Sequence, residues 1–167
     1  MPEAGTQRCF TIPRDDEADE PEVTPADVER AVREVGLPAL TVQIQPGTRT
    51  LVNADTILHT VPADFERTVS LLGFTVDLVA TPAQYRWNHG DGTSSSTAGP
   101  GRPWPAADVT HRYRRAADAV QASVDVTYRV TYRVNGGAWQ TLSAPITAAG
   151  PATSLQVAEA APVLVRP

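Results

Sequence analysis

The amino-acid sequence predicts a mainly β protein, an antiparallel β-sandwich with one short N-terminal helix. From residue 38 onward, short runs of apolar residues alternate with polar ones, which is the pattern of strands that bury one face. Glycine, proline and asparagine separate these runs and favour tight turns between strands. The only helical spacing of apolar residues lies before residue 38, so no later helix is available to cross over between parallel strands.

Composition and charge are those of one soluble domain that does not bind nucleic acid. The chain has 167 residues, of which 41% are hydrophobic and 20% are charged. Its net charge is −5, and it has no cluster of basic residues to neutralise phosphates. No apolar segment is long enough to cross a membrane. All 14 cationic residues are arginine, which excludes a lysine nucleophile or a P-loop lysine.

The N-terminal segment is expected to be an extended acidic tether over residues 1–24. Residues 13–25 are acidic, contain prolines and have few large apolar groups, so they cannot bury enough surface to fold alone. Cys9, in the same segment, is the only cysteine, which excludes an intrachain disulfide and a cysteine-based zinc cluster. It is either a free thiol or pairs with another chain.

A helix is predicted within residues 25–37, over about Pro25–Val35. Thr24 is a good N-cap and Pro25 suits the first helical position. Apolar residues then recur at helical spacing, and Gly36 and Pro38 end the helix.

Residues 38–167 are predicted to form the sandwich. Apolar alternation indicates strands within residues 40–46, 49–62 and 65–82, which end at Pro46, Pro62, Gly73 and Pro82.

The clearest strand runs from residue 120 to 134, with an apolar residue at every other position apart from Ala122. It is much longer than the usual strand of about five or six residues, so we expect it to bend or to pass between sheet edges. Residues 135–137, Asn-Gly-Gly, predict a hairpin turn. Residues 138–146 return from it, and residues 153–165 supply the closing strand.

The stretch "YRWNHGDGTSSS", followed by "DVTHRYRR" and the long alternating strand, resembles the PKD domain family, whose fold is an immunoglobulin-like sandwich. The matching residues are Trp87, the Gly90-Asp91-Gly92 turn, and His111 and Tyr113 some twenty positions later. The family more often has an Asp in place of Asn88 and an aromatic residue in place of His89. The resemblance covers residues 74–160 approximately and implies a PKD-like core there.

A narrower resemblance places the chain near a group of uncharacterised actinobacterial secreted or cell-envelope proteins, some of them associated with surface pili. The segments that carry it are "GLPALTVQIQP", "LVNADTILH", "VDLVATPAQYRWNHGDGT", "GPGRPWP" and "LQVAEAAPVLV". It implies an extracellular or cell-surface location.

We interpret the Gly-Asp-Gly motif as a structural turn. Its glycines permit backbone angles closed to other residues, and its carboxylate accepts hydrogen bonds from neighbouring amides. Trp87 is expected to fill the core, and the side chains at 111 and 113, two apart, are expected to pack near the turn. The structural motif comprises Trp87, Asn88, Gly90, Asp91, Gly92, His111 and Tyr113.

A catalytic role is the rival interpretation of the same stretch. A serine of residues 94–96, His89 or His111, and Asp91 contain the residue types of a hydrolytic triad. We expect these serines to lie in a flexible loop, and there is no G-x-S-x-G motif, so we predict no enzymatic activity.

We expect no cofactor, although Asn88 and Asp91 with loop carbonyls offer oxygen ligands for calcium. The three histidines are too scattered along the sequence to indicate zinc.

Two surfaces are candidates for partner contacts. Residues 93–108 form a long loop rich in proline and glycine that contains Arg102 and Trp104. We expect Trp104 to fold back and cap the sandwich end, and the alternative is an exposed ring that binds a partner or stacks on a sugar. The second surface is the polar face of the long strand, with Arg129 and Arg133.

The expected function is that of a non-enzymatic extracellular or cell-surface module that makes protein–protein contacts in adhesion or pilus-related assembly. Its expected partners are other envelope or surface-assembly proteins, with self-association as a further expectation and no membrane insertion. The first alternative is a phage virion structural or decoration protein with an immunoglobulin-like fold. The second is a carbohydrate-binding module, which requires a planar row of exposed aromatic rings.

Overall fold

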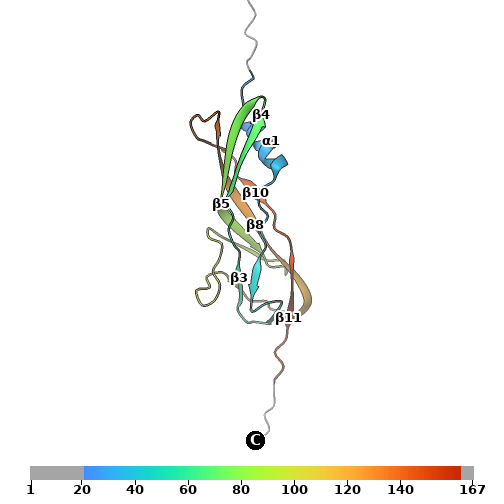
Figure 1. The fold of residues 1–167 in the computed structure, drawn as a ribbon. Helices are drawn as coiled ribbons and strands as arrows, with labels where there is room; N and C mark the ends of the chain where they lie inside the picture. The colour runs from blue at the N-terminus through green and yellow to red at the C-terminus, as the bar shows by residue number, and fades with distance from the viewer. Residues whose placement is uncertain (1–20, 163–167) are drawn as a thin grey trace, which may run out of the picture.

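A computed structural model describes residues 21–162 of the chain, a mainly β structure with one short helix (Figure 1). Cys9, most of the expected acidic tether and the end of the expected closing strand lie outside these residues. The elements are α1 (Pro25–Val35), β1 (Gln43–Gln45), β2 (Arg49–Leu51), β3 (Thr56–His59), β4 (Phe65–Leu71), β5 (Phe74–Asn88), β6 (Ser94–Thr97), β7 (Thr110–His111), β8 (Ala117–Val134), β9 (Gln140–Thr141), β10 (Ile146–Ala148) and β11 (Thr153–Ala158).

The strands form two sheets of unequal size. The smaller sheet has the order β1-β3-β7, and the larger one has the order β2-β11-β8-β5-β4, with β6 added to β5 and with β9 and β10 added to β8. The larger sheet is curled along its length (Figure 1). Its two central strands, β5 and β8, extend through most of the molecule.

The predicted long strand is confirmed as β8, which has 18 residues. The alternate side chains from Val120 to Tyr132, including Ala122, are buried, while the residues between them face outward or are half-buried. β8 pairs with β5 from Val134 down to Ser123, and its other edge is divided among β9, β10 and β11. One edge of β8 thus pairs with a single long strand, and the other pairs with three short strands in succession.

The helix prediction is also confirmed. Thr24 and Asp27 form a reciprocal capping box at the start of α1, which satisfies backbone donors that otherwise lack a partner. Val28, Ala31 and Val32 are buried, and the first and last of these belong to the main hydrophobic core. α1 thus covers the inner face of the larger sheet near β4 (Figure 1).

Two expectations about the strands are wrong. The sheets are not wholly antiparallel, because β11 pairs with β2 in the parallel sense. These strands are far apart in the sequence, so the chain between them makes the connection and no crossover helix is needed. The serines expected in a flexible loop form β6, which pairs with β5 from Tyr85↔Thr97 to Asn88↔Ser94.

The molecule is elongated, and the described chain enters and leaves at opposite ends. The segment before α1 lies at the end that carries the β4–β5 turn, and the segment after β11 lies at the other end (Figure 1). We refer to the part with α1 and β4 as the upper half, and to the part with β3, β6 and β11 as the lower half. The Gly-Asp-Gly motif follows β5 and belongs to the lower half.

Candidate functional site

The turn after β5 depends on Gly90. Its φ is +81°, and a Cβ atom built on it would lie 2.6 Å from the backbone nitrogen and oxygen of Gln121 in β8. A side chain at this position would therefore be strained in its backbone and would also collide with backbone that has little freedom to move. Gly92 has a similar φ of +89°, but no atom lies within 4 Å of its hypothetical Cβ.

Asp91 uses one carboxylate oxygen within its own turn and the other toward the smaller sheet. Its Oδ1 accepts hydrogen bonds from the Thr93 backbone N–H at 3.0 Å and from Thr93 Oγ1 at 2.6 Å. Its Oδ2 lies 2.7 Å from Nε2 of His111, which is at the end of β7 in the smaller sheet. Burial opposes ionisation, but the bonds from Thr93 and His111 outweigh it and lower the pKa of Asp91 to about 2.

His89 lies at the centre of the cluster, although the sequence analysis named it only as a candidate catalytic base and not as part of the structural motif. Its ring stacks on that of His111 with a centroid distance of 3.8 Å and an interplanar angle of 6°. Only 3% of the residue is exposed, and Nδ1 has no hydrogen-bond partner within the described residues. Burial and the neighbouring His111 lower the pKa of His89 to about 4, so the ring is neutral at pH 7.

Tyr113 completes the contact between the sheets. Its ring packs edge-on against His111 at a centroid distance of 4.6 Å, and its hydroxyl donates to the backbone carbonyl of His89 at 2.8 Å. Burial raises the pKa of Tyr113 to about 12, so it remains a donor at all ordinary pH values. Side chains of β7 and of the segment that follows it are thereby fastened to the β5–β6 turn at several points.

The hydrogen bonds in this cluster form two separate pairs. Ser95 Oγ lies 3.2 Å from Nε2 of His89, whereas Asp91 is bonded to His111. A Ser-His-Asp triad instead requires one imidazole that contacts the hydroxyl through one nitrogen and the carboxylate through the other. The ring beside Ser95 lacks this carboxylate, and its low pKa makes it a weak base at neutral pH.

The two residues considered for calcium have different partners. Asn88 directs its amide toward β8, where Nδ2 donates to Asp125 Oδ2 at 2.9 Å and to Ser123 Oγ at 3.2 Å. Asp91 is bonded instead to Thr93 and His111. Within residues 21–162, no group of three or more His, Cys, Asp or Glu side chains is arranged to hold a metal ion.

Trp87 is fully buried in the main core, and its indole N–H donates to Thr97 Oγ1 of β6 at 2.8 Å. This bond gives the buried polar atom a partner and ties the β5–β6 hairpin together.

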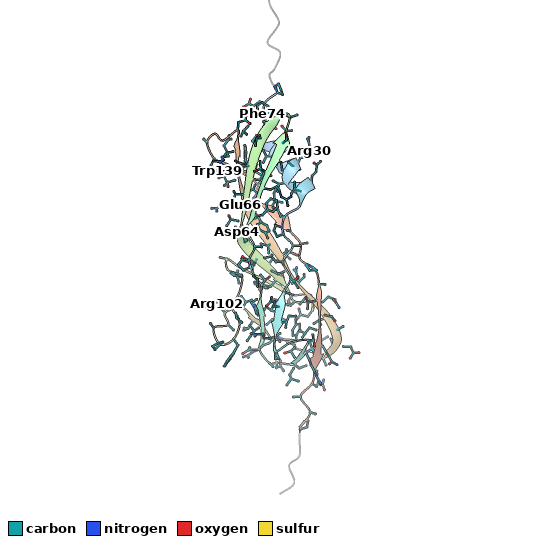
Figure 2. All side chains as sticks on the ribbon, viewed as in Figure 1. Arg30, Asp64, Glu66, Phe74, Arg102 and Trp139 are labelled. Carbon is teal, nitrogen blue, oxygen red and sulfur yellow. The ribbon has the colours of Figure 1, made fainter. Side chains whose placement is uncertain are left out.

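The capping role expected for Trp104 is wrong, because 73% of the residue is exposed. Two contacts hold its loop in place. The Trp104 backbone N–H donates to Gln45 Oε1 of β1 at 2.8 Å, and Arg102 pairs with Asp108 within the loop at 2.9 Å. Figure 2 shows Arg102 on a loop that projects from the side of the lower half. The backbone anchor fixes the loop at this point, and the ring remains open to solvent.

The two candidate arginines of β8 differ in their surroundings. Arg133 donates to Asp77 Oδ2 at 2.8 Å, and its guanidinium lies 4.8 Å from the centroid of the Trp139 ring. Arg129 is exposed and has no ion pair among the described residues. Arg129 is therefore the more available of the two for a ligand.

No family model and no curated protein matches the chain. From residue 21 to residue 162, the structure contains no helix with the length and hydropathy that a membrane span requires.

Proposed function

We propose that this protein is a non-enzymatic structural and interaction module of the cell surface, built on an immunoglobulin-like, PKD-like sandwich. In this proposal the smaller sheet packs against the lower half of the larger sheet, and the Gly-Asp-Gly turn fastens the two sheets. The upper half of β5 and β8, with β4 and α1, extends the sandwich into a rod. The partners are other envelope or surface-assembly proteins.

The observation that carries the proposal is the use of the polar cluster as a fastener. Asp91 and Tyr113 each make a hydrogen bond that connects the β5–β6 turn with the β7 region, and the two histidine rings stack across the same junction. These contacts give a structural role to Asp91, His89 and His111, the residues that the rival interpretation treats as catalytic. The pairing of Ser95 with a weakly basic ring supports the same conclusion.

Exposed aromatic rings support protein contact over carbohydrate binding. All four tyrosines are buried, and Trp87 is in the core. The other two tryptophans, Trp104 and Trp139, are exposed but lie in different halves of the molecule. Trp139 is near the upper end, whereas Arg102, which precedes Trp104 by two residues, is in the lower half (Figure 2). A flat row of stacked rings is therefore hard to build, whereas a single exposed Trp104 on an anchored loop suits a protein contact.

The test of non-enzymatic function compares the purified wild type with one variant. Ser95→Ala and wild type are incubated with peptide, ester and cell-wall substrates, and product formation is measured together with the thermal midpoint. We expect no turnover from either protein. Turnover that disappears in Ser95→Ala while the midpoint stays unchanged would refute the proposal.

The surface location is tested in the native host. Protease added to intact cells is expected to degrade this protein and to spare a cytoplasmic marker, as followed by immunoblot. Recovery of the protein in purified phage particles, with none on the cell surface, would instead support the virion alternative.

A further inference from the structure

The outer face of the larger sheet carries a groove of about 740 Å³ that crosses several strands. This volume is within the range of about 300–1,000 Å³ that is usual for ligand sites. The groove passes from the end of β6 over β5 and β8 to the segment that follows β9. Its lining residues are Ala83, Gln84, Ser96, Thr97, Ala98, Thr127, Arg129, Thr141, Leu142, Ser143 and Pro145.

The groove coincides with an irregularity in β5. The register between β5 and β8 shifts between Pro82 and Gln84, and Ala83 and Gln84 line the groove at this point. A bulge of this kind bends a strand and increases its twist. Small side chains at Ala83, Ser96 and Ala98 leave the space beside the bend open.

The chemistry of the lining favours a carboxylate on an extended chain. Arg129 is the only charged residue in the lining, and it has no ion pair among the described residues. Its guanidinium can donate two parallel hydrogen bonds to one carboxylate, and the serine and threonine hydroxyls around it can donate to peptide carbonyls. The lining contains no aromatic ring on which a sugar would stack.

The sequence itself contains a segment of matching chemistry. Five of the six residues from 15 to 20 are acidic, namely Asp15, Asp16, Glu17, Asp19 and Glu20. Fully extended, six residues span up to about 20 Å. Four neighbouring strands, spaced by about 4.8 Å, present a face about 14 Å across, so this stretch is long enough to cross the groove.

We propose that the groove binds the acidic stretch, residues 15–20, of a second copy of this chain. Val23, three residues after the stretch, packs against the main core, which is on the inner face of the larger sheet. Arg129 lies on the opposite face, because its neighbours Tyr128 and Val130 point into the core. The stretch of the same copy would have to turn around the sheet edge, whereas that of a second copy can approach from outside.

The test uses the absence of lysine from the chain. Arg129→Lys introduces the only side-chain amine, which a carbodiimide can join to a carboxylate that lies within contact distance. Full-length Arg129→Lys protein labelled with ¹⁵N is mixed with the unlabelled variant and treated with the reagent, and the linked peptides are identified by mass spectrometry. We expect links between position 129 and residues 15–20 that combine both isotopes, and a yield that falls about tenfold at high salt because screening weakens the attraction.

Matched controls separate contact from chance collision. Arg114→Lys places an amine at another exposed arginine, and it is expected to give at least about tenfold fewer links to the stretch because Arg114 does not line the groove. A second control replaces each Asp of the stretch with Asn and each Glu with Gln. Without carboxylates in the stretch, we expect no links between it and position 129. Links confined to one isotope, links only to other carboxylates, no links, or equal yields from the two lysine variants would each overturn the inference.

This inference rests on the proposed interaction function, but the two fail differently. Substrate turnover would contradict the proposed function whatever the cross-linking result. A missing cross-link would remove the second-copy contact and leave the proposed function in place.

Discussion

Asp91 makes three hydrogen bonds at the turn after β5, and one of them reaches the smaller sheet. In Asp91→Asn, an amide replaces a carboxylate that accepts hydrogen bonds from Thr93 and makes one with His111. Hydrogen bonds to charged groups contribute about 1.5–3 kcal/mol each, and the amide retains part of this. We expect the free energy of unfolding, measured by urea denaturation, to fall by about 1–3 kcal/mol.

Asp108→Asn is the matched control, because its carboxylate pairs with Arg102 across a mostly exposed contact. Such pairs contribute little, so a loss below about 1 kcal/mol is expected. Equal losses in the two variants would mean that the Asp91 contacts do not fasten the sheets.

Protonation of His89 gives the second prediction at this scale. Its pKa is about 4 in the folded chain against a usual value of 6.5, so the folded state resists protonation and the unfolded state does not. The stabilising effect is complete above pH 6.5 and is lost as the pH falls toward 4, by at most about 3 kcal/mol. Urea denaturation between pH 7 and pH 4 measures it.

The control for this pH dependence is His89→Gln, which has no titrating group at position 89. We expect its free energy of unfolding to change less over the same pH range than that of wild type. Asp91 adds a separate loss at lower pH, because its pKa of about 2 is below the usual 3.8 and its ionised form favours the folded state. A wild-type curve as flat as that of His89→Gln between pH 7 and pH 4 would contradict the burial of the neutral ring.

At the scale of elements, the β5–β6 hairpin depends on the two glycines of its turn to different degrees. Gly90→Ala combines an unfavourable φ with a collision against Gln121, so we expect a loss above about 2 kcal/mol in the free energy of unfolding. Gly92→Ala meets only the backbone cost, about 1 kcal/mol, because no atom is near its Cβ. Urea denaturation of both variants checks the order, and a larger loss for Gly92→Ala would contradict the close approach of β8.

Elements with local signals could be predicted from the sequence, and those built by distant contacts could not. The alternation from Val120 to Val134 and the cap at Thr24 act within their own segments, so β8 and α1 were predictable. β6 was missed because four consecutive hydroxyl residues have no apolar alternation, and its strand exists only through pairing with β5.

In the candidate site, too, only the features with a local signal could be predicted from the sequence. Gly90 and Gly92 favour a turn by themselves, so the turn could be located. His89 is buried and stacks on His111, which lies on a strand distant in the sequence, so no local pattern reports this contact. The exposure of Trp104 is set by a backbone bond to Gln45, 59 positions earlier in the chain.

At the scale of the whole molecule, continuous strands should make the two halves unfold together. β5 and β8 pair from Val76↔Val134 to Asn88↔Ser123, so neither half can lose its sheet without disturbing the other. In the double variant Trp104→Phe, Trp139→Phe, the fluorescence of Trp87 reports the lower half, and the circular dichroism of α1 reports the upper half. We expect both signals to change at the same urea concentration, as in a two-state transition. Separate midpoints would show that the bulge near Pro82 divides the sheet into independent units.

The segment before α1 and the segment after β11 lie at opposite ends of the body, which sets how far apart groups attached to them are held (Figure 1). Two fluorescent proteins attached through short linkers, one at each of these positions, would be held apart by the full length of the body. Energy transfer between them would therefore be weak in the native protein. The pairing of β5 with β8 along most of their length thus sets the separation of the two attachment points.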